Sequence, residues 1–256
     1  GTMCPSYMAT RDEMHSTRGR SNVLRELATR PQSLNWADQH EVLYALDLCL
    51  SCKACKSECP SGVDMAKLKA DYLQNHYDAN PIPLRSRIIA NFPGLMKMAS
   101  AIRPVSNIVL RSKVLSFIVK LSFGFAPKRP LPVLSKKRLS VWYNEHSSQN
   151  LAPNGRVYLF NDEFLDVNDS HIGIKAIQLL EKLGYEVVIP NHTYSGRTYL
   201  SKGFVKEARK LAEENVSLLS SVISPETPLI GIEPSAILTF RDEYPELVNE
   251  SLKEDA

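Results

Sequence analysis

Four cysteines within eleven residues constrain this chain more than any other feature of its sequence. Of the five cysteines among 256 residues, the first is Cys4 and the others form the run Cys49-Leu-Ser-Cys52-Lys-Ala-Cys55-Lys-Ser-Glu-Cys59. An odd number of thiols, most of them closely spaced, cannot all pair as disulfides. Such spacing is typical of metal ligands in a reducing compartment. The chain must therefore form a tight loop that presents several thiols to one centre.

The run ends in Cys-Pro and has the C-x2-C-x2-C-x3-C-P spacing of bacterial-type ferredoxins. In such a run the first three thiolates bind one [4Fe–4S] cluster, its fourth ligand comes from elsewhere, and the last cysteine serves a different cluster. Because Cys4 is also followed by proline, we predict that it completes the first cluster. The predicted ligands of that cluster are Cys4, Cys49, Cys52 and Cys55. Cys59 is expected to serve a second cluster with cysteines upstream of residue 1, as if the sequence began inside a two-cluster domain.

Zinc ligation and structural burial fit these cysteines less well. A zinc site more naturally uses two separated C-x2-C pairs, and buried structural cysteines do not gather in this way. For Cys59 a second interpretation stays open, namely a free, oxidisable thiol.

Helical patterns surround the cysteine run and strand patterns follow it. The predicted helices span residues 16–29, 38–47 and 65–77, with Ser16 and Asp64 as N-caps and Pro31 as a stop signal, and shorter helices follow over 84–125. The predicted strands span residues 157–160, 185–189 and 228–232, separated by helices over 172–183 and 202–221. A β-α-β-α-β order indicates a parallel sheet with right-handed crossovers.

These patterns predict an α plus α/β protein. A helical ferredoxin-like domain with a basic helical extension is expected over residues 1–127, followed by an irregular linker over 128–155. A partial α/β domain is expected over residues 156–256.

Several stretches resemble a known family. Residues Cys4-Pro-Ser-Tyr-Met-Ala-Thr-Arg-Asp-Glu, His15-Ser-Thr-Arg-Gly-Arg20 and the segment 49–68 resemble the iron–sulfur portion of FAD-linked oxidases that dehydrogenate D-2-hydroxy acids. Residues 195–197, 201–203 and 231–235 resemble the start of a cysteine-rich domain. That domain is shared with the iron–sulfur subunit of glycerol-3-phosphate dehydrogenase and with the B subunit of heterodisulfide reductase.

The resemblance implies an electron relay. In that reading an FAD-binding domain or subunit oxidises D-lactate, glycolate or D-2-hydroxyglutarate, and this chain passes the electrons to a quinone or a carrier protein. Two alternatives stay open. One is an interaction scaffold stabilised by its cluster without redox turnover, and the other is a subunit of a glycerol-3-phosphate dehydrogenase or heterodisulfide reductase-like system.

The back half departs from the family pattern. Tyr194-Ser195-Gly196 stands where that domain has Cys-Cys-Gly, and Ala236 replaces the cysteine after Glu-Pro-Ser, so we expect no metal site within residues 151–256. Polar residues near the predicted strand ends suggest either helix caps or a small-molecule pocket. These residues are Asp162, Glu163, His192, Arg197, Glu233 and Arg241.

Basic residues close to the cysteines in sequence are candidates for raising the reduction potential of the cluster. Positive charge and hydrogen bonds to sulfur raise the reduction potential of a cluster, whereas a solvated helix face would also be basic. The five residues concerned are Arg11, Arg18, Arg20, Lys53 and Lys56.

Charge divides unevenly along the chain. Residues 1–150 hold 21 Lys and Arg against 11 Asp and Glu, while residues 151–256 hold 10 against 17. Between Asp78 and Glu145 no acidic residue occurs among twelve Lys and Arg. A basic and apolar stretch over 84–138 suits peripheral contact with an anionic membrane, or a docking face for the acidic half or the flavin domain. We expect a cytoplasmic protein, since no signal peptide or spanning segment is visible, and no nucleic-acid partner.

Overall fold

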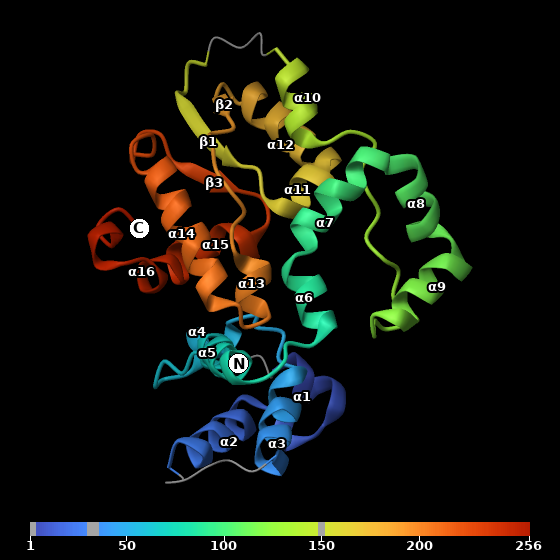
Figure 1. Ribbon diagram of the computed structural model, residues 1–256. Helices are drawn as coiled ribbons and strands as arrows, with labels where there is room; N and C mark the ends of the chain where they lie inside the picture. The colour runs from blue at the N-terminus through green and yellow to red at the C-terminus, as the bar shows by residue number, and fades with distance from the viewer. Residues whose placement is uncertain (1–3, 30–35, 148–151) are drawn as a thin grey trace. The chain divides into compact units, whose positions relative to one another are not determined.

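The computed structural model describes residues 4–29, 36–147 and 152–256, which are mostly helical and include one small parallel sheet (Figure 1). These residues group into two units, 1–80 and 81–256. None of the described helices is both long and apolar enough to cross a bilayer.

The N-terminal unit consists of short helices around the cysteine run. Its helices are α1 (Pro5–Thr10), η1 (Glu13–His15), α2 (Thr17–Thr29), α3 (Trp36–Asp47), α4 (Ala54–Glu58) and α5 (Met65–Ala79). Val42, Leu46 and Met65 form the centre of its core, and Leu24 and Leu27 of α2 pack against them.

Both predicted N-caps of this unit are confirmed. Ser16 Oγ accepts the backbone N–H of Gly19 at 2.9 Å, and Asp64 Oδ1 accepts that of Lys67 at 3.0 Å. The predicted stop at Pro31 lies outside the described residues.

The buried stripe of α5 includes a lysine and leaves out one of the helix's leucines. Met65, Lys69 and Leu73, spaced four residues apart, are buried, whereas Leu68 is exposed. Residues at i and i+4 share a helix face, so the stripe follows this row and includes a lysine.

The C-terminal unit begins with helices that the sequence placed in the first domain. They are α6 (Leu84–Ala90), α7 (Phe92–Ala99), η2 (Ser100–Ile102), α8 (Arg103–Arg111) and α9 (Lys113–Ser122). Thr198 Oγ1 donates to the carbonyl of Ala90 at 2.9 Å, and the rings of Phe92 and Phe164 stack with centroids 5.9 Å apart. These contacts connect α6 and α7 to the α/β elements within one unit, 81–256. The extent of the functional domain over 1–127 stays a prediction.

The remaining elements form the predicted α/β arrangement. They are α10 (Leu139–Glu145), β1 (Arg156–Phe160), α11 (Glu163–Val167), α12 (Ser170–Lys182), β2 (Glu186–Val188), α13 (Arg197–Ser201), α14 (Val205–Leu219), β3 (Leu229–Gly231), α15 (Pro234–Asp242), α16 (Tyr244–Leu247) and η3 (Glu250–Leu252).

The three strands pair in the order β2-β1-β3, all parallel, with Val157 opposite Val187 and Leu159 opposite Ile230. Leu159 and Phe160 are fully buried on the two faces of β1. Leu159 packs with α10 and α12 residues, and Phe160 meets the ring of Phe240 on α15. Burial of a parallel strand on both faces explains the nearly continuous apolar sequence of β1.

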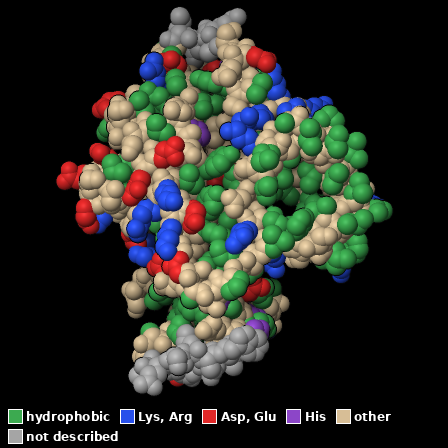
Figure 2. All heavy atoms as spheres, viewed as in Figure 1, with side chains coloured by type: hydrophobic (Ala, Val, Ile, Leu, Met, Phe, Trp, Pro, Cys, Tyr) green, Lys and Arg blue, Asp and Glu red, His purple; other side chains and the backbone are tan. Residues whose placement is uncertain are grey.

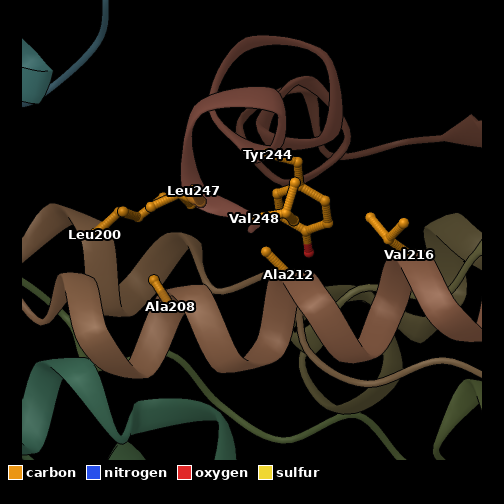
Figure 3. Close-up of a cluster of buried hydrophobic side chains, with 7 residues drawn as sticks. All are labelled: Leu200, Ala208, Ala212, Val216, Tyr244, Leu247 and Val248. Atoms are coloured by element: carbon orange, nitrogen blue, oxygen red, sulfur yellow. The ribbon is translucent and has the colours of Figure 1, made fainter. Parts of the chain in front are cut away.

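A second core joins α13, α14 and α16 (Figure 3). Ala208 and Ala212 lie four residues apart on α14, and Tyr244 and Leu247 pack over them. The small side chains on this row leave space for the tyrosine ring.

Candidate metal centre

Four thiols of the N-terminal unit line one cavity of about 320 Å³. They are Cys4, Cys49, Cys52 and Cys55. The rest of its wall is largely apolar and includes Met8, Leu50 and Met65. Cys59 is not among the lining residues. The assignment of these thiols to clusters stays a prediction.

The cysteine loop follows α3 and uses two left-handed residues. The backbone N–H of Cys49 donates to the carbonyl of Leu46 at 3.0 Å, which ends the helix. Ser51 and Lys53 then have φ of 54° and 61°, a region that residues other than glycine seldom adopt. These two turns bring the chain back to the cavity at Cys52 and Cys55.

Arg20 of α2 contacts the thiol of Cys4, which lies outside the cysteine run. The residue is 1% exposed, and its guanidinium donates from Nη1 to Cys4 Sγ at 3.3 Å, from Nη2 to Ser6 Oγ at 2.8 Å and from Nε to the carbonyl of Ala45 at 2.7 Å. Within the described part of the chain, no carboxylate pairs with Arg20. A buried cation needs a nearby negative charge, and the thiolate form of Cys4 supplies one.

The thiols differ in acidity for identifiable reasons. Burial alone would raise the pKa of Cys4, but hydrogen bonds with Ser6 and Arg20 lower it by more. The pKa of Cys4 therefore lies below the ordinary value. Burial raises the pKa of Cys55. Hydrogen bonds from backbone N–H groups, that of Val63 foremost, lower the pKa of Cys59. Both effects favour the thiolate forms of Cys4 and Cys59.

The five basic residues named from the sequence occupy different surroundings. Arg20 contacts a thiol and Lys53 lines the cavity, whereas Arg18 pairs with Glu13 at the surface and Lys56 pairs with Asp64. Arg11 ends α1 in a left-handed conformation. Of these five residues, Arg20 and Lys53 are the two that line the cavity of the thiols.

Lys69 also supports the cysteine loop, although it was not among the residues predicted to lie at the site. It is buried, and its Nζ donates to the carbonyl of Cys49 at 2.7 Å, so it supports the start of the cysteine loop. The spacing of four from Met65 and from Leu73 was a signal for its inward position.

The donor set fits an iron–sulfur cluster better than a single ion. Among the described residues, no three Cys, His, Asp or Glu side chains converge as the ligands of one metal ion do. In a cubane each thiolate binds a different iron, so the sulfurs are spread around the group. Four thiols around an apolar cavity, with a buried guanidinium on one of them, suit an anionic cluster.

The polar residues named in the back half divide between a cavity and structural roles. Asp162, Glu163 and His192 line a second cavity of about 320 Å³ beyond β1 and β2. Asp162 also caps α11, accepting the N–H groups of Phe164 and Leu165 at 2.9 and 3.0 Å.

The remaining three lie outside that lining. Glu233 caps α15, Arg197 pairs with Glu243 at 3.2 Å, and Arg241 contacts Asp242 at the surface. Capping and loop contacts account for these residues, and a ligand of the cavity stays a prediction.

Ser195, which stands where the resembled domain has a cysteine, forms hydrogen bonds with Glu163. Ser195 is fully buried, and its Oγ donates to Glu163 Oε1 at 2.7 Å while its backbone N–H donates to Oε2 at 3.0 Å. Burial raises the pKa of Glu163. Ser195 thus stabilises the buried carboxyl group of Glu163 with two hydrogen bonds.

Comparisons with known proteins find matches to the N-terminal segment and to the longer chain. Residues 2–64 match the family model of a 4Fe-4S dicluster domain. The whole chain is 25% identical to the D-2-hydroxyglutarate dehydrogenase of Pantoea ananatis, over 97% of this chain and 28% of that protein. It is also 25% identical to the C subunit of the anaerobic glycerol-3-phosphate dehydrogenase of Escherichia coli, over 68% of this chain and 44% of that protein.

A third relative is the glycolate oxidase iron-sulfur subunit of Escherichia coli, 26% identical over 59% of this chain and 37% of that protein. The chain spans about a quarter of the length of the D-2-hydroxyglutarate dehydrogenases that it matches. No solved structure matches it. The similarity to these relatives confirms the resemblance drawn from the sequence.

Proposed function

We propose that this chain binds a [4Fe–4S] cluster and relays single electrons. The observation that carries the proposal is that four thiols line one cavity with Arg20 on one of them. The cluster ligands would be Cys4, Cys49, Cys52 and Cys55. A cluster bound there supplies reversible one-electron transfer at a potential that the surrounding protein sets.

Residues of this chain would set that potential. The Arg20 guanidinium places a buried positive charge beside Cys4, which would favour the reduced state of a bound cluster. The apolar wall, with Met8, Leu50 and Met65, would lower the polarity around the cluster.

Cys59 is proposed as a ligand of a second cluster. Its pKa is lowered by backbone N–H groups, that of Val63 foremost, and such donors also stabilise a bound thiolate. The family model that matches residues 2–64 describes a dicluster domain. The further thiolates for this second cluster would come from outside the five cysteines of the sequence.

We further propose that the electrons come from an FAD-binding oxidase domain or subunit that acts on a 2-hydroxy acid of the D-lactate, glycolate or D-2-hydroxyglutarate type. The names of the relatives support this assignment. A glycerol-3-phosphate dehydrogenase-like system is the second candidate, supported by the similarity to the C subunit of that enzyme.

The electron acceptor would be a quinone or a carrier protein. Peripheral contact of residues 84–138 with the inner face of a membrane would suit a quinone. Two observations support that contact: α8 and α9 expose large apolar side chains, and the stretch between Asp78 and Glu145 carries only positive charge.

Anaerobic reconstitution of the full chain with iron and sulfide tests the relay. We expect about four irons per chain and an EPR signal that appears on reduction. Cys4→Ser should lose this signal, whereas the matched variant Cys59→Ser should retain it. A cluster that no reductant can reduce would favour the scaffold function, and zinc or no metal would contradict the proposal.

A further inference from the structure

A third cavity, different in character from the first two, lies among α6, α7, α8 and α9. Its volume is about 440 Å³, and its wall is almost wholly apolar. The side chains that define it include Ile89, Phe92, Met96, Leu110, Val119 and Phe123. A space of this lining has few hydrogen-bonding groups to offer a polar metabolite, so it suits an aliphatic chain.

The helices around this cavity expose apolar side chains instead of burying them. Figure 2 shows hydrophobic side chains gathered over the part of the surface where Figure 1 places α8 and α9. The exposed apolar side chains of these two helices include Val105, Ile108, Val114, Phe117, Ile118 and Leu121. Leu121 is 68% exposed, and α8 has no buried residue. A contiguous apolar patch of this kind marks a surface that binds a partner or a membrane.

Charge indicates which of these the patch contacts. The charged residues of the cavity lining, within the described part of the chain, are Lys120 and Arg129, both cationic. Lys120 is buried and its Nζ donates to the carbonyls of Pro127 and Arg129 at 2.7 and 3.2 Å. Since the whole stretch lacks acidic residues, an anionic apolar partner is complementary to it.

We propose that this cavity binds one acyl chain of an anionic phospholipid, with the head group near the exposed Arg129. The proposal rests on the membrane contact suggested above and adds a specific lipid site to it. The exposed residues of α8 and α9 would lie in the bilayer interface, and the cavity would take a chain from it.

Titration calorimetry of the full chain with monomeric dihexanoyl phosphatidylglycerol tests the cavity. We expect saturable binding that is tighter than for dihexanoyl phosphatidylcholine. Val119→Trp fills the cavity and should weaken binding about tenfold or more. Ala126→Trp, which fills the cavity from an exposed loop position, should do the same and guards against misfolding of the first variant.

Flotation with phosphatidylglycerol vesicles tests the membrane contact separately. Leu121→Asp, outside the cavity lining, should reduce flotation but leave monomer binding unchanged, and Leu179→Asp on α12 is its exposed control. Flotation without monomer binding would overturn the lipid site alone, and monomer binding without flotation would overturn the membrane contact alone. Failure of both, or a preference for phosphatidylcholine, would overturn the inference.

Discussion

Arg20 donates a hydrogen bond from Nη1 to Sγ of Cys4, 3.3 Å away, although sixteen residues separate the two in sequence. The guanidinium is buried and also fixes Ser6 and the carbonyl of Ala45. The Arg20 side chain therefore connects α1 and the end of α3 to the thiol of Cys4, the predicted fourth ligand.

Arg20→Gln should lower the reduction potential of a reconstituted cluster. A hydrogen bond to a charged group contributes about 1.5–3 kcal/mol, and 1.4 kcal/mol corresponds to about 59 mV for one electron. We expect a fall of up to about 100 mV, since the bond also exists in the oxidised state. Potentiometric EPR titration measures it. Arg18→Gln, at the surface pair with Glu13, should leave the potential unchanged, and an equal shift in both variants would contradict a local role for Arg20.

Asp162→Asn should stabilise the C-terminal unit at neutral pH. Burial raises the pKa of Asp162 to about 6 from an ordinary 3.8. The folded state therefore holds this proton more tightly than the unfolded state, and stability falls as the pH rises from about 4 to 6. The full penalty above pH 6 is about 3 kcal/mol, and asparagine preserves the cap without it.

Urea unfolding at several pH values, followed by Trp142 fluorescence in a Trp36→Phe background, measures this effect. The gain should be about 1–3 kcal/mol at pH 8 and should shrink toward pH 4. A constant difference at every pH would show that the ionisation of Asp162 is not its cause.

Ser195→Ala should destabilise the C-terminal unit by about 1–3 kcal/mol. The buried carboxyl of Glu163 would lose the hydroxyl donor at 2.7 Å from the fully buried Ser195. Urea unfolding measures the loss. The control is Ser217→Ala, whose hydroxyl donates to the carbonyl of Glu213 at the surface and should change stability by no more than about 0.5 kcal/mol.

The sequence predicted the features that depend on local pattern. Cysteine spacing, the caps at Ser16 and Asp64 and the three strands follow from residues close together in the chain. Arg20 was only one of five basic candidates, because its partners lie on α1 and α3. Its spacing from Leu24 and Leu27, which pack on the core, was the available signal.

Two further features could not be predicted from local pattern. The division after Asn80 depends on contacts of Ala90 and Phe92 with residues far along the chain. The apolar residues of α8 and α9 have the same periodicity whether that face packs on a core or meets a membrane, so only the structure shows their exposure.

Tyr244→Phe should destabilise the second core by a mechanism other than cavity formation. The Tyr244 hydroxyl donates to the carbonyl of Ser195 at 3.0 Å and accepts from Asn215 Nδ2 at 2.9 Å, and burial raises its pKa. Phenylalanine keeps the ring over Ala212 but leaves one buried carbonyl without this donor. We expect a loss of about 1–3 kcal/mol.

Urea unfolding at constant pH in the same Trp36→Phe background measures that loss. Tyr199→Phe is the matched control, because its hydroxyl donates to Asn91 Oδ1 at the surface, and its cost should stay within about 0.5 kcal/mol. Since Tyr244 and Ser195 share this carbonyl contact, the double variant with Ser195→Ala should lose less than the two single losses added together. Strict additivity would mean that the hydroxyl of Tyr244 does not help to position Ser195 against Glu163.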